Sequence, residues 1–284
     1  MKAPPFDHVR PATLPEVIQL LQQHGDDARV LAGGQTLVAT LNMRLSEPTL
    51  LIDIGALAPL RGISVEGGTL RLGALATHAE IESSPLVAEH APLLSQAAPH
   101  IAHRAIRNLG TLGGSLAYAD PAAEWPACML ALDATLVLAG AQGERRIAAR
   151  DFFTGLYATA LHADELIVAC EVPVQAPDER QEFDELARRH GDYAIAGLAA
   201  RALLRNGRLH DVRLALLGVD DRPVRAARTE KALQGRAVDD ETLTLAVQTL
   251  STELQPAGDL TSGPDTKRHL AGVLLRRVLR RLAG

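Results

Sequence analysis

The sequence predicts an α+β fold in two parts, residues 1–175 and residues 176–284. In the first part, short apolar runs with strand character alternate with helical patterns, whereas a hairpin and three helices fill the second. Between them, Pro173 to Glu182 is polar and proline-containing, which is typical of a domain boundary. The chain has 284 residues, 47% of them hydrophobic, which is enough for a large core in two or three subdomains.

Local signals predict the elements of the first part. Thr13-Leu14-Pro15-Glu16 is a capping box that opens a helix ending at Gly25. Arg29 to Leu31 is a strand that leads into a glycine turn, and a helix follows from Thr36 or Leu37. The other expected elements are a strand at 50–54, a hairpin at 63–73, helices from Thr77 to before Pro85, at 86–98 and at 122–132, and strands at 135–138 and 166–172. The helix from Thr77 opens with a second capping box, Thr77-His78-Ala79-Glu80. We expect the first part to divide into subdomains near residues 55–60.

In the second part, Asn206-Gly207 lies between apolar runs at 194–204 and 209–217 and predicts a β-hairpin. Helices are expected at 226–233, 240–250 and 265–282. The last helix carries a basic stripe made of Lys267, Arg268, Arg276, Arg277, Arg280 and Arg281. The stripe could bind a partner or a nucleic acid, but the solvated face of an amphipathic helix is the commoner use.

Composition excludes several classes of function. The net charge of −5 gives no basic field for nucleic acid. No lysine lies between Lys2 and Lys231, so that stretch has no Schiff-base or phosphate-loop lysine. Two cysteines, Cys128 and Cys170, lie in apolar runs, where buried free thiols are expected, and they are too few for an iron–sulfur cluster. With neither a signal peptide nor a membrane-spanning run, a cytoplasmic protein is expected.

Glycine is densest between Asn108 and Ser115, where Gly110, Gly113 and Gly114 fall within five residues. Their spacing fits neither the dinucleotide-binding GxGxxG pattern nor the lysine-containing Walker loop. Two interpretations stay open at this point. The glycines form tight turns, which is their commoner use, or they form a phosphate cradle together with Ala32-Gly33-Gly34-Gln35-Thr36.

Two other clusters of polar side chains have alternative interpretations. Asp120 and Glu124 could act as acid and base, but Asp120 before Pro121 is typical of a helix cap, which we prefer. His100 and His103 lie one helical turn apart, yet no third ligand is spaced to complete a zinc site. We therefore do not expect a metal there.

Taken together, these motifs resemble a known family. Ala32 to Thr36, Ile106 to Ser115 and Ala119-Asp120-Pro121 look like the FAD-binding medium subunit of molybdenum hydroxylases, which include carbon monoxide dehydrogenase and bacterial xanthine dehydrogenases. Further similar segments follow in order along nearly the whole chain. They are Gly73 to Ile81, Asp151 to Gly155 and Arg188 to Ala194.

The resemblance implies a vanillyl-alcohol-oxidase (PCMH) type FAD-binding fold of two α/β subdomains, plus a C-terminal domain with a small antiparallel sheet and helices. It also implies an electron relay. A large subunit with a molybdenum cofactor oxidises the substrate, and a small iron–sulfur subunit passes electrons to FAD on this chain. FAD then reduces NAD, a quinone or oxygen. The assembly implied is a dimer of heterotrimers.

The resemblance also implies which residues bind FAD. Leu166 and Tyr193 would lie near the isoalloxazine ring, and Asp120, Glu124 and Thr77 would donate or accept hydrogen bonds. The full set is Ala32, Gly33, Gly34, Gln35, Thr36, Leu37, Thr77, Ile106, Gly110, Thr111, Gly113, Gly114, Ser115, Asp120, Glu124, Leu166 and Tyr193. No catalytic residue is expected on this chain.

Three positions depart from the family pattern. Ser115 replaces the usual Asn, and Glu124 stands where xanthine oxidases tend to have Asp. Asp184 and Glu185 occupy a stretch that often carries a Lys near the flavin. A carboxylate there would disfavour anionic reduced flavin. Two alternatives remain: a self-contained flavin oxidase or reductase of the same fold, and a scaffold subunit that has lost its flavin.

Overall fold

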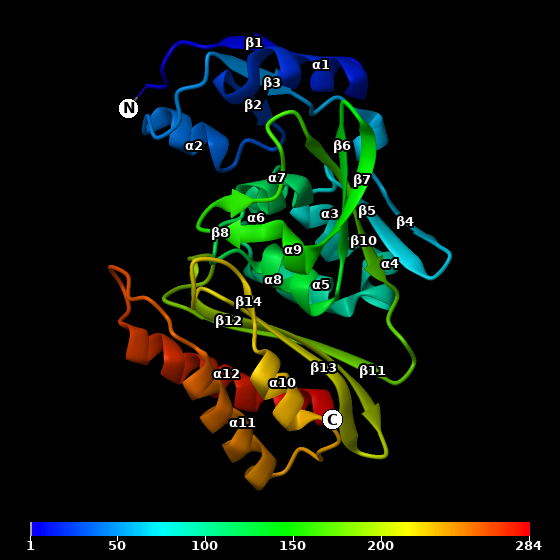
Figure 1. Cartoon of the computed structure of the whole chain (residues 1–284), viewed down its shortest axis with the longest axis vertical. Helices are drawn as coiled ribbons and strands as arrows, with labels where there is room; N and C mark the ends of the chain where they lie inside the picture. Colours follow the sequence, from blue (N-terminus) through cyan, green and yellow to red (C-terminus); the bar gives the residue numbers. More distant parts are fainter. Residues whose placement is uncertain (1) are drawn as a thin grey trace.

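The computed structural model describes residues 2–284 and stacks its elements in three tiers along the long axis (Figure 1). The N-terminal tier is a parallel three-stranded sheet, with β3 (Leu50–Asp53) between β1 (Asp7–Val9) and β2 (Ala28–Leu31). Two helices belong to this tier, α1 (Leu14–His24) and α2 (Leu37–Asn42). As predicted, Thr13 caps α1 and Gly25 ends it, although Glu16 accepts from Ala12 N and not from the cap amide.

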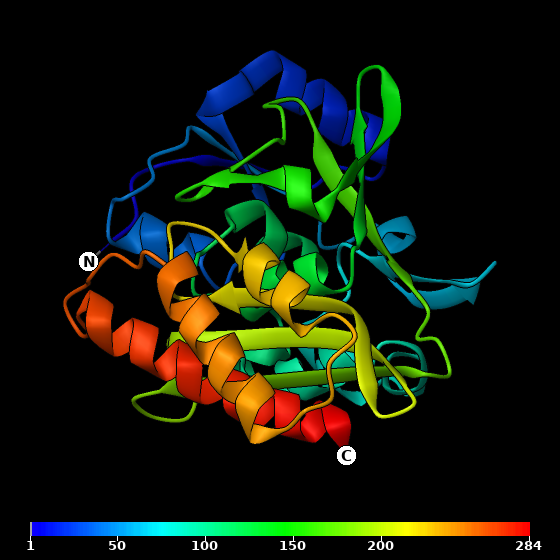
Figure 2. The ribbon, with the colours of Figure 1, turned by 60° about the horizontal axis from the view of Figure 1, so that its bottom comes forward.

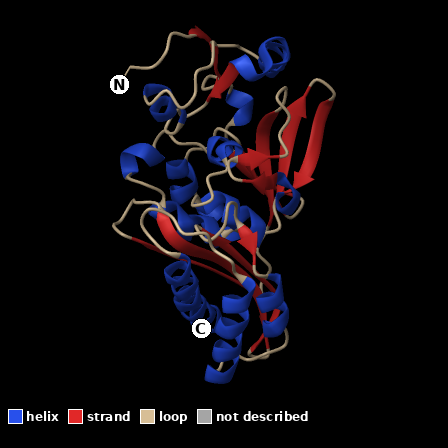
Figure 3. Cartoon of the chain, turned by 60° about the vertical axis from the view of Figure 1, so that its left-hand side comes forward, coloured by secondary structure: helices blue, strands red, loops and turns tan. Residues whose placement is uncertain are grey.

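The middle tier is a five-stranded antiparallel sheet beside a group of short helices (Figure 3). Its strands, in spatial order, are β4 (Ile63–Glu66), β5 (Thr69–Gly73), β10 (Leu166–Pro173), β6 (Thr135–Gly140) and β7 (Gly143–Ala148). The helices are α3 (His78–Ser83), α4 (Pro85–His90), α5 (Pro92–Ala97), α6 (Arg104–Arg107), α7 (Leu112–Tyr118), α8 (Glu124–Ala131) and α9 (Ala149–Phe152). A small hairpin, β8 (Phe153–Gly155) with β9 (Ala158–Thr159), completes the tier.

The C-terminal tier is an antiparallel sheet with helices packed on one face (Figure 2). The strands are β11 (Glu179–Ala187), β12 (Ala194–Arg205), β13 (Arg208–Leu217) and β14 (Val224–Arg225). The helices are α10 (Ala227–Leu233), α11 (Asp240–Glu253) and α12 (Pro264–Ala283). The predicted hairpin turn is confirmed, since Asn206 and Gly207 have φ of 50° and 70°, as a type I′ turn requires. The other face of the sheet packs against α5 and α8 of the middle tier.

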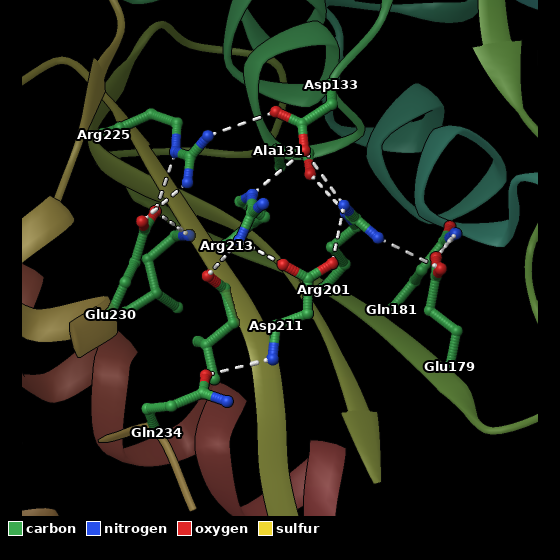
Figure 4. A network of polar contacts seen from close by, with 12 residues as sticks. Ala131, Asp133, Glu179, Gln181, Arg201, Asp211, Arg213, Arg225, Glu230 and Gln234 are labelled. Carbon is green, nitrogen blue, oxygen red and sulfur yellow. Dashed lines mark hydrogen bonds and ion pairs between the residues drawn. The ribbon is translucent and has the colours of Figure 1, made fainter. Parts of the chain in front are cut away.

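A network of arginines and carboxylates joins the middle tier to the C-terminal sheet (Figure 4). Asp133, just after α8, accepts hydrogen bonds from Arg201 at 2.9 Å, Arg213 at 2.9 Å and Arg225 at 3.1 Å. These arginines lie on β12, β13 and β14. Partial burial disfavours the Asp133 carboxylate, but hydrogen bonds and charge from Arg201 and Arg213 hold its pKa below the ordinary value. One carboxylate therefore ties three strands to the end of α8.

Several elements differ from the sequence prediction. The helix expected at 86–98 is interrupted at Pro92, because proline cannot donate to the preceding turn, so α4 and α5 are separate. Strands β7 and β11 were not predicted, since both are rich in charged residues. The helix expected from Ala122 starts at Glu124. Lys267 is not on a solvated face: it is buried and donates to Gly218 O at 2.8 Å.

Candidate functional site

The two glycine-rich segments meet in space. A Cβ added to Gly33 would overlap the backbone carbonyl of Leu109, one residue before Gly110. A Cβ on Gly110 would lie 2.6 Å from His78 Nε2, and one on Gly113 would lie 2.7 Å from Ala74 Cβ. Glycine is thus required at these positions because backbone and side chains approach closely.

The tight-turn interpretation of Gly110 to Ser115 is wrong. None of Gly110, Gly113 and Gly114 has a positive φ, and the last two lie in the first turn of α7. Thr111 caps this helix by accepting from Gly114 N at 3.2 Å. The sequence signal for the helix is a Thr cap followed by the buried Leu112 and Leu116 at i, i+4 spacing.

The amides at the start of α7 already have partners. Leu112 N donates to Ala76 O at 2.9 Å and Gly113 N donates to Ala74 O at 2.8 Å. The glycines therefore dock α7 against the segment between β5 and α3. In residues 2–284 the amide of Thr111 is the one in this first turn for which no acceptor is present. The segment from Leu109 to Ser115 therefore contributes a packed surface, which we call the wall, and few amides that are free to bind a ligand.

The loop before α2 has the opposite character. Across the described residues, nothing accepts a hydrogen bond from the amides of Gly33, Gly34, Gln35, Thr36 or Leu37. The loop is half-buried, and Gly34 has φ of 70°, a conformation that favours glycine. The side chain of Gln35 donates to Gly33 O at 2.9 Å and fixes the loop. Consecutive amides without acceptors form a concavity that suits an anion.

Thr77 lies beside this wall at the start of α3. Its hydroxyl accepts from Glu80 N at 3.1 Å and donates to Glu80 Oε2 at 2.9 Å, which confirms the predicted capping box. The next residue, His78, donates its amide to Gly110 O at 2.9 Å. The Thr77 hydroxyl has therefore used its proton and can act toward a ligand only as an acceptor.

Asp120 does not cap the following helix as expected. Its Oδ1 accepts from Ala122 N at 2.9 Å within a turn, and α8 begins two residues later with Ala123 as the N-cap. Pro121 precedes the first turn of α8, and Pro126 lies within it. The cap signal that Asp120 and Pro121 give in the sequence therefore lies about one turn before the helix begins. Burial raises the pKa of Asp120. Glu124 is buried in the first turn of α8.

The charge of Asp120 affects three tyrosines. The rings of Tyr118 and Tyr157 have centroids 5.1 Å apart, and Tyr193 is 69% exposed. Desolvation and then the Asp120 carboxylate raise the pKa of both Tyr118 and Tyr157. The same two causes, in the same order, raise the pKa of Tyr193 to about 12. Asp120 and Glu124 therefore both lie close enough to Tyr193 for their charges to affect it.

Leu166 belongs to a core against which Ala32 of the glycine loop packs. It is buried at the start of β10, in the core that β6 and β10 form with the N-terminal tier. Ile106, on α6, is half-buried one turn before Gly110. No group of three or more His, Cys, Asp or Glu in residues 2–284 could hold a metal, and His100 instead faces Glu185, with its Nδ1 3.4 Å from Oε1.

The alternation along β11 separates Asp184 from Glu185. Glu182 and Asp184 face α12, where both pair with Arg281. Gln181, Phe183 and Glu185 face the middle tier: Leu93 N donates to Gln181 Oε1, and the Phe183 ring packs on His100. Only Glu185 of the two acidic residues therefore lies on the side of the glycine segments.

Comparison with known proteins matches both parts of the chain. Residues 4–175 match the FAD binding domain in molybdopterin dehydrogenase, and residues 181–282 match the CO dehydrogenase flavoprotein C-terminal domain. The chain belongs to the FAD-binding medium subunits of molybdenum hydroxylases. It is thus a subunit of the molybdopterin-dependent class of oxidoreductases and carries an FAD-binding domain.

Relatives and solved structures agree over the full length. The chain is 36% identical to the carbon monoxide dehydrogenase medium chain of Hydrogenophaga pseudoflava, covering 98% of this chain and 97% of the relative. It is also 36% identical to 6-hydroxypseudooxynicotine dehydrogenase complex subunit alpha of Paenarthrobacter nicotinovorans, covering 98% and 95%. Quinoline 2-oxidoreductase from Pseudomonas putida 86 superposes with a TM-score of 0.95 at 41% identity, covering 100% and 98%. The vanillyl-alcohol-oxidase (PCMH) type fold with its C-terminal domain is confirmed.

Sequence reasoning missed two features of the site. The buried His78 accepts a hydrogen bond from the Trp125 indole, and Glu185 lies opposite His100. The motif around Thr77 pointed to the first, but a contact with Trp125 on α8 depends on tertiary packing. Glu185 could be assigned a side only once β11 was known to be a strand. In residues 2–284 no helix is long and apolar enough to cross a membrane.

Proposed function

We propose that FAD binds against the two glycine segments, and that the chain relays electrons from the iron–sulfur clusters of a small partner subunit to NAD, a quinone or oxygen. The proposed contacts are Ala32, Gly33, Gly34, Gln35, Thr36, Leu37, Thr77, Ile106, Gly110, Thr111, Gly113, Gly114, Ser115, Asp120, Glu124 and Tyr193. Leu166 would lie near the isoalloxazine ring. Bound FAD supplies reversible two-electron chemistry.

The observation that carries this proposal is the row of amides from Gly33 to Leu37, for which residues 2–284 offer no acceptor. A diphosphate is the part of FAD that needs such donors, and backbone amides can hold it where no lysine is present. The segment from Leu109 to Ser115 has a different role. Its glycines allow this segment to pack closely against Gly33. Its amides at Leu112 and Gly113 donate to the carbonyls of Ala76 and Ala74.

The remaining residues would orient the cofactor. Thr77 Oγ1 can accept a hydrogen bond, and the protonated or ionised carboxyls of Asp120 and Glu124 can bond hydroxyl groups. The exposed ring of Tyr193 offers a surface on which a flat ring can stack. Ser115 keeps a hydroxyl where the family pattern has an amide, so it can still donate one hydrogen bond.

Partners follow from the chemistry that this chain lacks. Both cysteines are buried free thiols, so the chain has no thiolates for a cluster. Medium and beta subunits of multi-subunit complexes are its relatives. We propose that a small iron–sulfur subunit and a large molybdenum-cofactor subunit join it in a cytoplasmic dimer of heterotrimers, and that the large subunit selects the substrate.

Two experiments test the proposal. The full chain is purified and titrated with FAD, and flavin absorbance is measured after removal of free ligand. We expect bound FAD, and competition by ADP, which carries the diphosphate without a flavin. Absence of bound flavin, or a failure of ADP to compete, contradicts the assignment of the loop. Co-purification with a tagged chain, followed by iron and molybdenum analysis, tests the partners. Turnover by the isolated chain would instead favour a self-contained flavoenzyme.

A further inference from the structure

Gly218, the residue that follows β13, is hydrogen-bonded to the turn that carries Asp120. Its amide donates to Pro121 O at 2.8 Å, and within that turn Asp120 Oδ1 accepts from Ala122 N at 2.9 Å. The carbonyl of Asp120 closes the same turn by accepting from Ala123 N at 3.0 Å. A backbone bond from the C-terminal sheet thus reaches the residue next to Asp120 and sets where this turn lies relative to the end of β13.

Gly218 also packs against the start of β12, which follows Tyr193 directly. Its φ is 76°, a conformation that favours glycine. A Cβ at this position would lie 2.9 Å from Ile195 O and 3.0 Å from Ala194 O, the first two residues of β12. Because backbone lies on both sides of this contact, a shift of Gly218 displaces the start of β12 and with it Tyr193.

The carbonyl of Gly218 is held by Lys267, on the first turn of α12. The Lys267 ammonium group donates to Gly218 O at 2.8 Å, and its side chain is only 10% exposed. The same nitrogen lies 2.7 Å from Asp259 Oδ2. Hydrogen bonds from a charged donor are stronger than those from a neutral one. Lys267 therefore fixes the one residue that contacts both the Asp120 turn and the start of β12.

The loop that begins at Gly218 reaches a further aromatic segment. Arg222 Nη1 donates to Thr154 O at 2.8 Å, in the hairpin formed by β8 and β9. Tyr157 lies between these two strands, and its ring centroid is 5.1 Å from that of Tyr118. The loop held by Lys267 is thus bonded to the hairpin that carries Tyr157 as well as to the Asp120 turn.

We propose that Lys267 is a positioning residue for the flavin half of FAD and acts through Gly218 on Asp120 and Tyr193. The inference rests on the proposed function, in which Asp120 and Tyr193 contact that half of the cofactor. The proposed diphosphate loop, residues 33–37, lies in the N-terminal tier, whereas Lys267 and Gly218 belong to the C-terminal tier (Figure 1). Loss of Lys267 should therefore weaken the contacts to the flavin half and leave those to the diphosphate unchanged.

Titrations with FAD and with ADP separate the two halves of the site. The full chain is titrated with each compound, as wild type and as Lys267→Met. We expect Lys267→Met to bind FAD about tenfold more weakly and ADP with unchanged affinity, because ADP carries the diphosphate without the flavin. Lys267→Arg keeps a charged donor at this position and should restore most of the FAD affinity.

Two control variants separate positioning from stability. Leu243→Ala removes a buried side chain of α11, the helix whose Asp240 pairs with Arg280 at the other end of α12, so it destabilises the same domain away from Lys267. It should leave the ratio of FAD to ADP affinity unchanged. Asp259→Asn removes the charge of the other Lys267 partner but keeps the bond to Gly218, so its FAD affinity should match the wild type.

Each outcome decides the proposal. Unchanged FAD affinity in Lys267→Met, or an equal loss of FAD and ADP affinity, would overturn it. Asp259→Asn binding FAD as weakly as Lys267→Met would also overturn it, because the loop before α12 would then be responsible. If Lys267→Met does not fold, Lys267→Gln, which is polar and one atom shorter, is titrated in its place and gives the same decision.

The wild-type titrations keep this inference distinct from the proposed function. A wild-type chain that binds neither FAD nor ADP contradicts the proposed function. Wild-type binding of both compounds, with an FAD affinity that does not depend on Lys267, contradicts the positioning role alone.

Discussion

The indole Nε1–H of Trp125 donates a hydrogen bond to Nδ1 of His78 across 2.9 Å, and both side chains are buried. Trp125 follows Glu124 in α8, and His78 follows Thr77 at the start of α3. The bond therefore holds together the starts of two helices, where the proposed cofactor contacts Thr77 and Glu124 lie. Because Nδ1 accepts, a neutral His78 carries its proton on Nε2, which points toward Gly110.

This pair predicts a loss of stability in acid. Burial and then the Arg107 charge lower the pKa of His78 to about 4, whereas an unfolded histidine takes a proton near pH 6.5. The free energy of unfolding should therefore fall as pH drops from about 6.5 toward 4, and this contribution should be constant above 6.5. Urea unfolding at pH 7 and pH 5 measures it, and Trp125 is the single tryptophan, so its fluorescence reports on the bond.

Matched variants isolate the histidine. His78→Gln keeps an acceptor for the indole but cannot be protonated, so its stability should depend less on pH over this range. His24→Gln removes an exposed histidine at the end of α1 and should keep the wild-type pH dependence. An equal acid dependence in His78→Gln and wild type would show that another group is responsible.

The contact between the two glycine segments predicts the effect of one added methyl group. Gly33→Ala places a Cβ onto the Leu109 carbonyl, and backbone on both sides cannot give way cheaply. We expect a cost of about 1–3 kcal/mol in the free energy of unfolding, together with weaker FAD binding. Urea unfolding and a flavin titration measure the two effects.

Gly263→Ala is the control for this substitution. No atom lies within 4 Å of its added Cβ, and its φ is negative, so the variant should unfold like the wild type. Wild-type stability and flavin affinity in Gly33→Ala would mean that the two segments separate easily.

The ion pairs of Asp133 should contribute to the free energy of unfolding, because they tie the C-terminal sheet to α8. Asp133→Asn removes the charge that three arginines share and leaves them partly buried around a neutral amide. We expect a loss of about 1–3 kcal/mol, because charged hydrogen bonds are replaced by weaker ones. The exposed Asp265→Asn, which breaks a surface pair with Arg268, should have little effect. If denaturation profiles of the two variants coincide, the network contributes no stability.

The sequence predicted most of the secondary structure, and it failed where tertiary contacts decide. The Asn206-Gly207 hairpin and the Thr77 capping box depend on neighbours in the chain, so they were recognised. The structural requirement for glycine at positions 110 and 113 was not recognised, because it comes from the close approach of His78 and Ala74, which belong to another segment. The side of the sheet to which Glu185 belongs was likewise invisible, since charged residues in β11 hide the alternation of a strand.

Lys267 was assigned to a solvated stripe and is in fact buried at the start of α12. Its ammonium group donates to Gly218 O at 2.8 Å and lies 2.7 Å from Asp259 Oδ2, so it fastens the loop before α12 to the end of β13. Lys267→Met fills similar space without a donor and should lose about 1.5–3 kcal/mol of unfolding free energy. Arg280→Met changes an exposed cation of the same helix and should unfold like the wild type. Equal stability of the two variants would mean that the buried contacts of Lys267 contribute no more than those of a solvated side chain. Faster hydrogen exchange at residues 254–263 in Lys267→Met alone would show that this one side chain holds the loop.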